Sequence, residues 1–561
     1  MHFGIDLGTT NSLIAVFRDG RPELIPNALG QVLTPSVVAL RDGQLVVGEA
    51  ARAIAISDPA NAASLFKRAM GTDRDYLLSG KPYRAPELSA MVLSALKADA
   101  EAALGVTVND VVISVPAYFN ELQRKAVRAA GRIAGLNVTR LINEPTAAAL
   151  SYGLHEREGE TRILVFDLGG GTFDISVLEL FEGVMEVRAS AGDAFLGGED
   201  FTEALARHIA QTAALDPHDT TLRPALLSLA EQAKRQLATA PEVKLAAQIN
   251  GTAIDQSLSR ERFEEITAQL LSRLGGPLDR ALNDANLTPD QIDRLILVGG
   301  ATRMHPVRAF AGRRLRQLPV SGVDPDQAVA LGAAVQAALV ARDAGLDDVV
   351  MTDVSAFTLG VDTVHRVGAG WKAGYFAPII ERNTVIPVSR EQSFSTVERG
   401  QTSVTFRIYQ GESPLVAGNL FLGEISIPVP KNLQAEEEVT VRFTYDVSGL
   451  LEVDVTANST GKKANLVITK LAGEMSEADI KAALKKLTAL KVHPRADAEN
   501  LHLKSRLEAA YAMARGEARD WVQGLVVAFD AAIDGQDKPA IAALRAEMHQ
   551  ALDRFEADHV R

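Results

Sequence analysis

The sequence predicts a multidomain protein in which an α/β region, an antiparallel β-sandwich and a helical region follow one another. Three observations support this fold class. Up to about residue 345, short apolar runs alternate with alanine-rich stretches, as strands and helices do in α/β domains. From Val354, apolar and polar residues alternate with a period of two, which is typical of sandwich strands. From Met475 the period becomes helical, with almost no strand signal.

The α/β region contains several well-defined segments. Helices are predicted over 85–104 and 120–134, and strands over 110–115 and 293–298. The alanine-dominated run at 328–344 predicts a buried helix.

The later regions have their own local signals. Sandwich strands are predicted through 404–408, 439–445, 453–455 and 466–468. Asp446-Val447-Ser448-Gly449 predicts a hairpin turn between two of them. Ser476 and Asp479 form a candidate N-cap pair at the first helix of the last region.

The composition narrows the class of protein. With 561 residues the chain is long enough for roughly three or four domains. A net charge of −13 argues against nucleic acid or an anionic membrane as the main partner. The absence of cysteine rules out disulfides and thiolate metal sites. No signal peptide and no bilayer-spanning stretch are visible, so a cytoplasmic protein is expected.

Two glycine-containing turns are the strongest functional signal. Asp6-Leu7-Gly8-Thr9-Thr10 and Asp167-Leu168-Gly169-Gly170-Gly171-Thr172-Phe173-Asp174 each lie between two apolar strands. Each supplies a carboxylate and then small residues whose backbone N–H groups can converge on an anion. A third turn, Gly299-Gly300, also follows a strand. The sequence therefore predicts two related halves that clamp a nucleotide, with a divalent metal between the aspartates.

Hydrolysis of a terminal phosphate requires positioning and charge neutralisation. Asp6 and Asp167 suit Mg²⁺ held through water, because magnesium keeps several of its waters. Glu144 is the candidate base or water-orienting group, and the alternative is a helix-start glutamate favoured by the dipole. Lys67 either reaches the γ-phosphate or is a solvated surface charge, and Asp174 either holds a monovalent cation or ends its turn. The hydroxyls of the turn threonines can bind phosphate or orient water; these are Thr9, Thr10 and Thr172.

Two further segments have two interpretations each. Glu231, Lys234 and Arg235 share one helical face, where they either flank ribose and adenine or form an ordinary intrahelical ion pair. Without a family match, the ion pair is favoured. The apolar stretch between aspartates at 346–354 is either an edge strand of the first domain or a linker that docks reversibly, with equal weight.

Several motifs in order identify a resemblance to one family over essentially the whole chain. The sequence closely resembles the DnaK-type chaperones, the seventy-kilodalton heat-shock family, and within it is most similar to the shorter HscC type. The motifs are the two turns with Asn11 and Ser12 after the first, Val115-Pro116-Ala117-Tyr118-Phe119, Asn143-Glu144-Pro145-Thr146-Ala147-Ala148-Ala149, Leu196-Gly197-Gly198-Glu199-Asp200-Phe201 and Asp324-Pro325-Asp326-Gln327-Ala328-Val329-Ala330.

The resemblance implies four parts and an ATP-driven cycle. An actin-like two-lobed ATPase domain would span 1–345, a linker 346–354, a β-sandwich that binds extended hydrophobic peptide 355–472, and a helical lid 473–561. ATP, with Mg²⁺ and K⁺, would open the peptide site, and peptide with a J-domain co-chaperone would trigger hydrolysis to ADP. The protein would be a monomer that serves unfolded polypeptide clients, with no role for nucleic acid or membrane.

The resemblance also implies roles for individual residues. Pro116 and Arg140 match positions that relay between the domains, and Arg140 and Asp353 match positions tied to the J-domain and the linker. The peptide cleft maps to the segment around Phe376, Phe394, Val397 and Val404, which in the alternative reading are sandwich core. Residues implied to contact nucleotide or phosphate, besides the turn threonines, are Gly8, Asn11, Gly169, Gly170, Gly171, Gly197, Gly198, Glu199, Glu231, Lys234, Arg235, Gly299, Gly300, Arg303 and Asp326.

The chain departs from the family pattern at several places. The linker reads Val349-Val350-Met351-Thr352-Asp353 instead of a leucine run, so it buries less apolar area and docking is expected to be weaker or tuned differently. Ala238 replaces a serine that usually contacts nucleotide. The stretch between Lys67 and Val115 is shorter than usual, which leaves dependence on the standard exchange factor open. Phe376 replaces a smaller residue of an arch over the peptide, and the helical tail is short, so a different substrate range is expected.

Two other functions fit part of the sequence. A filament-forming protein of the actin type would share the two turns but has no need of a sandwich and lid after residue 354. A small-molecule kinase with the same core would need a separate catalytic base, and the sequence shows no candidate. An ATP-driven peptide-binding chaperone is therefore the favoured function.

Overall fold

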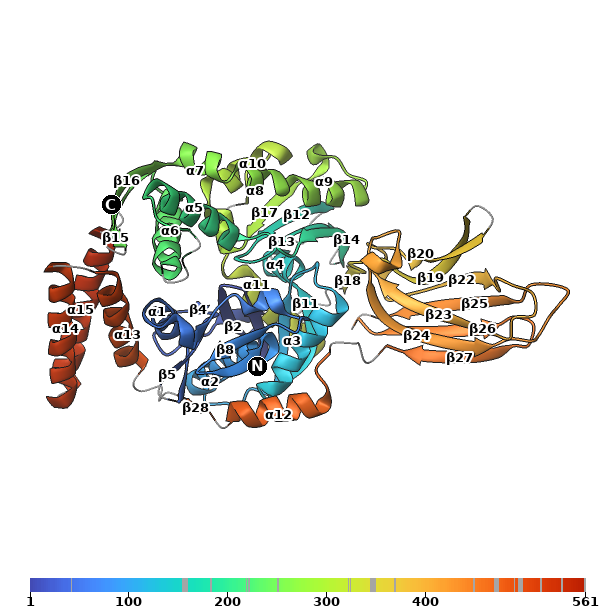
Figure 1. Ribbon diagram of the computed structural model, residues 1–561, viewed down its shortest axis with the longest axis horizontal. Helices are drawn as coiled ribbons and strands as arrows, with labels where there is room; N and C mark the ends of the chain where they lie inside the picture. Colours follow the sequence, from blue (N-terminus) through green and yellow to red (C-terminus); the bar gives the residue numbers. More distant parts are fainter. Residues whose placement is uncertain are drawn as a thin grey trace.

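The computed structural model describes residues 1–41, 43–153, 160–181, 184–217, 219, 222–249, 252–320, 322, 324–343, 350–367, 370–446, 449–468, 474–488, 490–492, 498–514, 517–535 and 538–558. A large α/β body occupies the centre of the molecule, a sandwich of strands lies on its right, and the C-terminal helices run back along the body to its left side (Figure 1). Among the described residues, no helix is long and apolar enough to cross a membrane.

The first lobe of the body is built on a six-stranded sheet with the order β11-β10-β1-β2-β3, in which β4 also pairs with β2. Apolar residues on both faces of β1 and β2 are covered by helices, which explains the nearly continuous burial of these strands. The strands are β1 (His2–Leu7), β2 (Asn11–Arg18), β3 (Arg21–Leu24), β4 (Thr34–Pro35), β10 (Asp110–Val115) and β11 (Asn137–Asn143), and the helices are α2 (Ala85–Leu104), α3 (Glu121–Ile133) and α11 (Ala328–Val340).

An outer extension of the first lobe carries two small sheets, β28-β6-β5-β7 and β8-β9. Its elements are β5 (Val38–Arg41), β6 (Gln44–Val47), α1 (Glu49–Ser57), η1 (Pro59–Asn61), β7 (Ala62–Ala63), η2 (Phe66–Ala69), β8 (Asp75–Leu78) and β9 (Lys81–Arg84). One strand of the first small sheet, β28 (Lys491–Val492), comes from the C-terminal region.

The second lobe is built on another six-stranded sheet, β17-β12-β13-β14-β18-β21. Its strands are β12 (Thr161–Leu168), β13 (Phe173–Phe181), β14 (Val184–Asp193), β17 (Arg294–Val298), β18 (Val350–Val354) and β21 (Val385–Ile386), and β15 (Glu242–Ile249) and β16 (Thr252–Ser259) form a separate hairpin. Helix α4 (Glu144–Gly153) leads from β11 into this lobe, and the helices that follow its strands are α5 (Gly198–Thr212), α6 (Arg223–Leu237), α7 (Arg260–Ile266), α8 (Ala268–Arg273), α9 (Gly275–Asp284), η3 (Pro289–Gln291), η4 (Gly300–Arg303) and α10 (His305–Leu315).

The two lobes repeat one topology, which confirms the predicted duplication. In each, an antiparallel hairpin holds the glycine turn, and its first strand has a parallel neighbour: β10 beside β1, and β17 beside β12. Helices α4 and α11 pack together between the sheets. Their backbones approach so closely that a Cβ on Gly332 would lie 1.7 Å from the Ala147 carbonyl oxygen, so glycine is required there.

The sandwich has two four-stranded antiparallel sheets, β20-β19-β23-β24 and β22-β25-β26-β27. The predicted alternation is confirmed in β26, where Leu451, Val453, Val455 and Ala457 are buried and the residues between them are half-buried. The elements are β19 (Leu359–Val367), β20 (Gly370–Ile380), β22 (Val388–Ser395), β23 (Ser403–Gln410), η5 (Val416–Gly418), β24 (Leu420–Pro428), β25 (Glu438–Tyr445), β26 (Leu451–Ala457) and β27 (Lys462–Val467).

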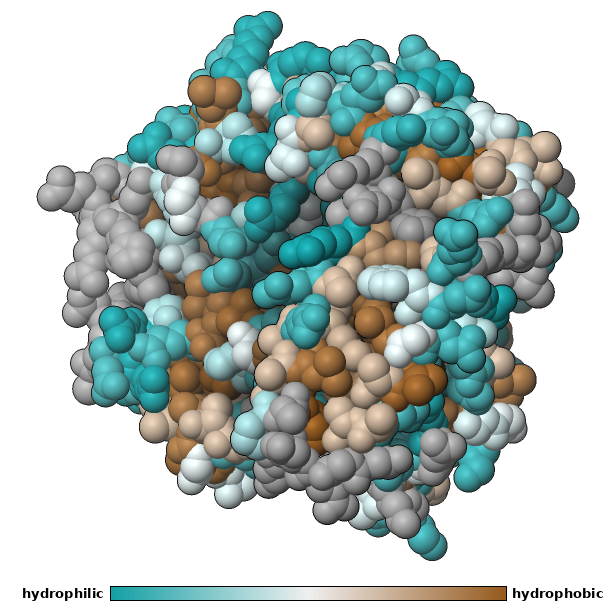
Figure 2. All heavy atoms as spheres, turned by 90° about the vertical axis from the view of Figure 1, so that its left-hand side faces the viewer, coloured by the Kyte–Doolittle hydropathy of each residue, from teal (hydrophilic) through white to brown (hydrophobic). Residues whose placement is uncertain are grey.

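The C-terminal region contains α12 (Glu477–Thr488), α13 (Ala498–Met513), α14 (Glu517–Gly535) and α15 (Lys538–Asp558). Helix α12 packs on α3 and α2 of the first lobe, α13 packs on α1, and the last three helices form a bundle around one small core. Polar and apolar side chains are mixed on the face of the molecule that this bundle occupies (Figure 2), and Trp521 and Val527 of α14 are exposed. The predicted N-cap is confirmed, because the Asp479 N–H donates to the Ser476 hydroxyl at 3.1 Å.

Three sequence predictions need correction. The helix expected to reach residue 344 ends at Val340, because Arg342 adopts a positive φ of 54° and the chain closes in a left-handed turn. The C-terminal region contains a short strand, β28, because the free edge of β6 offers unpaired backbone groups. The strand expected to include Ile468 ends at Val467.

Some predicted features lie outside the described residues. These are Val447 and Ser448 of the predicted turn, linker residues 346–349, and the proposed boundary at 472–473.

Candidate functional site

The two glycine turns meet face to face between the lobes. The first lies between β1 and β2, and the second between β12 and β13. A Cβ on Gly170 would lie 1.7 Å from the Thr10 hydroxyl oxygen, so only glycine permits this approach. The structure thus brings together two loops that are more than a hundred residues apart in the chain, as the sequence predicted.

Two more glycine turns complete the cluster. At the start of α5, the Gly198 and Glu199 N–H groups donate to the carbonyls of Gly169 and Gly170, each at 2.9 Å. The Gly299 turn after β17 passes equally close to the second turn, and Thr302 closes it by donating to the Gly299 carbonyl at 2.7 Å. Four backbone turns therefore converge on one place, with helix N-termini and small residues beside it.

Acidic side chains gather behind these turns. The Asp6 carboxylate accepts a hydrogen bond from the Ser114 hydroxyl at 2.7 Å, and Asp174 accepts one from the Tyr118 N–H at 3.0 Å. Asp167 is 5% exposed and Asp174 is 1% exposed. One carboxylate oxygen of each, Oδ2, is buried without a hydrogen-bond partner among the described residues. Buried carboxylate oxygens without partners are unfavourable unless a proton or a cation satisfies them.

Lys67 is a buried cation whose charge acts on these acids. Its ammonium donates to Glu144 at 2.7 Å, both side chains are buried, and it lies 5.7 Å from the centre of the Phe119 ring. The surface-charge interpretation of Lys67 is therefore wrong. Glu144 begins α4, as expected for a glutamate at a helix start that the helix dipole favours. Its carboxylate nevertheless lies inside the acidic cluster and is buried.

The electrostatics of the cluster favour binding of positive charge. Burial first, and the charge of Glu144 second, raise the pKa of Asp6 to about 7 and that of Asp174 to about 8, while Lys67 opposes both shifts. The same burial raises the pKa of Asp167 well above its usual range. A raised carboxyl pKa means that the anion lacks compensation in this environment. The free oxygens and the hard oxygen donors fit Mg²⁺ or K⁺.

The cluster does not form a metal site made of side chains alone. In the described ranges, no group of three or more histidine, aspartate or glutamate residues is arranged to hold a metal ion. A magnesium ion at Asp6 and Asp167 would therefore complete its shell with water and phosphate oxygens.

Helix α6 supplies the predicted face of Glu231, Lys234 and Arg235. Lys234 donates to the Gly198 carbonyl at 3.1 Å and to the Thr202 hydroxyl at 2.8 Å, so it lies at the α5 turn. Glu231 accepts from the same threonine at 2.7 Å and from Arg235 at 2.9 Å. Burial alone would raise the pKa of Glu231, but the charges of Lys234 and Arg235 and the threonine hydroxyl together lower it.

The ion pair proposed as the alternative for Glu231 and Arg235 is thus present. Arg235 also keeps an exposed guanidinium that can stack on a base. Beside these residues, burial raises the pKa of Glu199, and Thr10 donates to Glu199 at 3.5 Å. Ala238 caps the C-terminus of α6, and its carbonyl accepts a hydrogen bond from Arg260 at 3.2 Å.

Other predicted residues line the same cluster. Arg303 bonds Asp326 at 2.7 and 2.9 Å and Asp324 at 2.8 Å, which fixes the loop before α11 against the Gly299 turn. Thr9 and Thr172 are buried in the turns, Gly8 lies within the first turn, and Asn11 directly follows it as the first residue of β2.

Sequence reasoning missed Arg68. Its guanidinium donates to the Gly171 carbonyl at 3.0 Å and to both carboxylate oxygens of Asp200, at 3.2 and 2.5 Å. It therefore ties the second turn to the first lobe. The only signal was its place directly after Lys67, and an arginine next to a lysine is usually a surface residue.

The acidic cluster connects to strand β18 through one neighbour of Glu144. The Asn143 side-chain amide donates to both oxygens of Asp353, at 3.0 and 2.9 Å, and Arg124 donates to the Asn143 oxygen at 2.6 Å. Burial raises the pKa of Asp353 above its usual value. The hydrogen bond from the Val354 N–H, the charges of Arg124 and Arg140, and the hydrogen bond from Asn143 oppose this rise. Arg140 lies on β11, and Pro116 directly follows β10, so both predicted relay residues border this connection.

Strand β18 also joins the body to the sandwich. It pairs in parallel with β14, where Val350 lies opposite Val184, and antiparallel with β21, where Asp353 lies opposite Ile386. Residues 350–354 of the stretch predicted at 346–354 therefore form a strand of the second-lobe sheet, but not an edge strand, because β21 pairs with the side of β18 that β14 leaves free.

The sandwich contacts the second lobe through long-range polar contacts that sequence reasoning did not find. Arg382 bonds Asp284 at 2.8 and 2.9 Å, and the Asn383 amide donates to the same carboxylate at 2.8 Å. The Ser190 N–H donates to the Asn383 oxygen at 2.9 Å. No local pattern marks such pairs, because their members are about one hundred or more residues apart.

The C-terminal helices are held against the first lobe. Ile480 and Ala483 of α12 are buried in the lobe's own core. Around them Arg132 binds Glu477 at 2.6 and 2.7 Å, and farther along Arg41 binds Glu508 at 2.5 and 2.7 Å. The helical region is thus packed on the body and away from the sandwich strands (Figure 1).

The four predicted peptide-cleft residues come from different elements of the sandwich. Phe376 lies on β20, Phe394 on β22 and Val404 on β23, while Val397 follows β22. Phe394 and Val404 are partly buried against the sandwich core, and Phe394 contacts Phe406 with ring centres 5.4 Å apart. They are therefore core-edge residues, and their exposed parts are available to a ligand.

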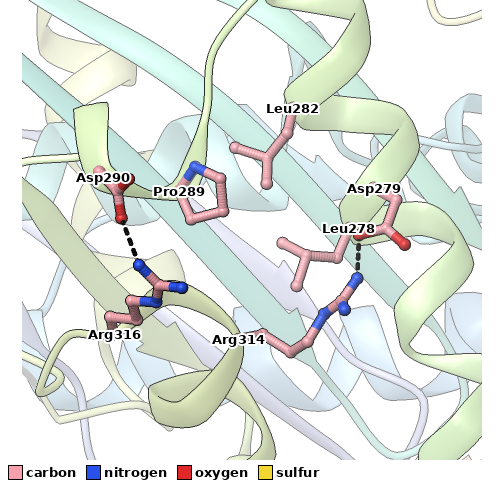
Figure 3. Close-up of a pocket in the computed structure, with 7 residues that line it drawn as sticks. All are labelled: Leu278, Asp279, Leu282, Pro289, Asp290, Arg314 and Arg316. Carbon is pink, nitrogen blue, oxygen red and sulfur yellow. Dashed lines mark hydrogen bonds and ion pairs between the residues drawn. The ribbon is translucent and has the colours of Figure 1, made fainter.

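A cavity of about 280 Å³ lies elsewhere on the second lobe, between α9, η3 and α10 (Figure 3). Leu278, Leu282 and Pro289 form its apolar lining, and the pairs Asp279–Arg314 and Asp290–Arg316 flank it. None of the predicted site residues lines this cavity.

Comparison with known proteins agrees with this arrangement. The family model described as "Hsp70 protein" matches residues 2–78 and 74–560. The chain is 42% identical over 523 residues to "Chaperone protein DnaK" of Thermotoga neapolitana and equally to that of Thermotoga petrophila, covering 90% of this chain and 86% of each relative. The chain therefore belongs to the Hsp70 family of ATP-hydrolysing chaperones that bind unfolded polypeptides.

Proposed function

We propose that ATP is hydrolysed where the four glycine turns converge, and that the state of this site controls peptide binding in the sandwich. The observation that carries the proposal is the buried acidic cluster behind the turns, whose free oxygens lie beside backbone groups suited to phosphate. Phosphoryl transfer depends mainly on positioning and charge neutralisation, and the cluster provides both.

In this proposal, each predicted residue has a role. Asp6 and Asp167 would hold the waters of Mg²⁺, and Asp174 would hold K⁺. Lys67 lies toward the terminal phosphate, Glu144 accepts a proton from the attacking water, and Thr172 orients that water. The backbone of the turns binds the phosphates, and α6 binds the nucleoside. Bound Mg²⁺ would neutralise charge on the phosphates and on the departing diphosphate.

The domain organisation follows from these roles. We assign 1–345 to an actin-like nucleotide-binding domain, 346–354 to the linker, 355–472 to the peptide-binding sandwich and 473–561 to the lid. The contact from Asn143 to Asp353 supports coupling, since it links a neighbour of the catalytic glutamate to the linker. We further propose that the chain is of the HscC type, works with a J-domain co-chaperone and is a monomer.

Turnover measurements test the proposed site. We expect slow ATP hydrolysis that accelerates when an unfolded hydrophobic peptide is added. Thr172→Ala should lower turnover about tenfold or more, because a positioning hydroxyl is lost. Thr288→Ala, an exposed threonine on the same lobe, is the matched control. Wild-type turnover in Thr172→Ala would contradict the assigned site.

A further inference from the structure

Two histidines lie against each other in the bundle formed by α13, α14 and α15. The rings of His502 on α13 and His549 on α15 have centres 5.3 Å apart, and their planes are inclined by 34°. Both side chains are partly buried. Helix α13 is also the helix of the bundle that packs on α1 of the first lobe (Figure 1). The histidine pair therefore belongs to the helix that holds the bundle on the body.

A hydrogen bond fixes the protonation of one ring. Arg506 Nη1 lies 2.9 Å from His549 Nδ1. A guanidinium has donors only, so Nδ1 must be the acceptor and the His549 ring must be neutral. A proton on Nδ1 would remove this acceptor and place a second positive charge against the guanidinium.

The other ring is surrounded by positive charge from three helices. Burial first, and then His549 of α15, Arg506 of α13 and Arg52 of α1, lower the pKa of His502 to about 4. Arg52 belongs to the first lobe, so its charge acts on His502 across the contact between the bundle and the body. Docking of the bundle therefore disfavours a proton on His502.

His549 is disfavoured as a cation for the same reasons. Burial and then the charge of Arg506 lower its pKa, the charge of Arg545 adds to this effect, and the charges of Asp553 and Glu499 oppose it. Since the two rings are in contact, a proton on either one further disfavours a proton on the other.

The acids around the pair are already engaged by arginines. The three ion pairs are Asp553–Arg506 at 2.8 Å, Glu49–Arg52 at 2.6 Å and Glu499–Arg545. Among the other elements packed on α13, helix α14 carries Asp530, which pairs with Lys504 at 3.3 Å, and β15 carries the exposed Glu242 and Lys244. In the part of the chain that the structure describes, neither histidine forms an ion pair with a carboxylate, so a proton on the pair would lack a direct anionic partner.

We propose that His502 and His549 form an acid-sensitive latch, whose protonation releases the bundle from the first lobe. The inference rests on the proposed role of residues 473–561 as a lid. When α13 leaves α1, His502 loses burial and the charge of Arg52, so it binds a proton more readily. By linkage, the docked form loses stability as the pH falls from the ordinary histidine pKa of 6.5 towards about 4.

Energy transfer between the bundle and the first lobe measures docking. The sequence contains no cysteine, so Lys81→Cys on the first lobe and Glu547→Cys on α15 provide the two dye positions, and both residues are exposed. The full-length labelled protein is compared at about pH 7.5 and about pH 5.5 with saturating ATP and Mg²⁺. The test variant is His502→Gln/His549→Gln, because glutamine takes up no proton and its side-chain oxygen can still accept from Arg506.

We expect the docking equilibrium constant of the parent to fall about three- to tenfold between the two pH values, because release favours proton uptake by His502. The double variant should dock equally at both. His208→Gln, a partly buried histidine of α5 whose pKa burial also lowers, is the matched control and should respond as the parent does. Arg52→Gln leaves the bundle intact and should move the midpoint of release to lower pH.

Three results would overturn the inference. Energy transfer that is independent of pH in the parent would show that no acid-sensitive latch exists. An equal fall in the parent and in the histidine double variant would assign the response to other groups. An unchanged midpoint in Arg52→Gln would exclude repulsion across the contact as the cause. Each of these results leaves ATP hydrolysis and its stimulation by peptide intact, whereas the absence of both in the parent at about pH 7.5 would contradict the proposed function instead.

Discussion

The nucleotide cleft and the interdomain contacts are held together in different ways. In the cleft, backbone turns meet at distances that only glycine permits, and each turn is a continuous motif in the sequence. Between the domains, single side chains from distant segments form pairs, such as Asp284 with Arg382 and Asn143 with Asp353. In the proposed function, the chemistry therefore depends on local motifs, whereas the coupling between domains depends on long-range pairs.

The largest effect should follow from removing the buried ammonium of the cleft. Lys67→Met leaves Glu144 without its cation in a buried site, and we expect ATP turnover to fall about a hundred- to a thousandfold. Single-turnover hydrolysis with radiolabelled ATP measures the change. Lys81→Met, an exposed lysine of β9, is the control. Full turnover in Lys67→Met would show that the cleft does not depend on this charge.

The next effect should appear at the sandwich contact. Asp284→Ala removes the acceptor of three hydrogen bonds from Arg382 and Asn383 and leaves the guanidinium with Glu412 alone. We expect docking of the sandwich to weaken by about 2 kcal/mol or more. Energy transfer between dyes on the body and the sandwich measures docking. The charge exchange Asp284→Arg/Arg382→Asp should restore part of the docking. Unchanged energy transfer in Asp284→Ala would show that this contact does not hold the sandwich on the body.

The acidic cluster predicts a dependence of stability on pH. The pKa values of Asp6 and Asp174 are raised by folding, so their protonated forms favour the native state and this contribution is lost as pH rises through about 7 and 8. The nucleotide-free protein should therefore unfold at a lower temperature at pH 9 than at pH 6. Magnesium and ADP should reduce the difference, because a cation replaces the protons. An unfolding temperature that rises with pH in the free protein would contradict the charge assignment.

The smallest effect on docking should come from the exposed ion pair between α3 and α12. Arg132 and Glu477 form a bidentate pair, but both side chains are at least half exposed. Arg132→Ala should weaken docking of α12 by less than about 1 kcal/mol. Ile480→Ala, in the buried core of the same contact, should cost about 2 kcal/mol or more. Hydrogen exchange in α12 compares the two, and a larger effect from Arg132 would reverse this ranking.

Much of the cleft could be predicted from the sequence, because strand periodicity and glycine turns are local signals. The turns at Gly8 and Gly170, the aspartates beside them and the capping pair at Ser476 all lie where the sequence placed them. The end of α11 was missed, since Arg342 carries no signal for the left-handed conformation that it adopts. The roles of Arg68 and Asp284 were missed because their partners come from other elements, and only the folded chain brings them together.

The linker was predicted partly from a local sequence signal and partly not, because its contacts involve distant residues. The apolar stretch between aspartates gave a strand as one of two interpretations, and residues 350–354 form the strand β18. The proposed coupling depends on Asp353, which the sequence singled out only by resemblance and whose partner Asn143 was not foreseen. The structure places residues 350–354 as a strand between β14 and β21, and reversible docking of this strand stays a prediction.

The central claim is that the cleft and the peptide site are coupled through Asp353. The most direct test compares peptide-stimulated with basal ATP hydrolysis in the wild type, Asp353→Ala, Asn143→Ala and the double variant. The account predicts that Asp353→Ala binds ATP normally but loses stimulation, and that the double variant loses no more than the single variants, because the two residues act as one unit. Full peptide stimulation in Asp353→Ala would contradict the account.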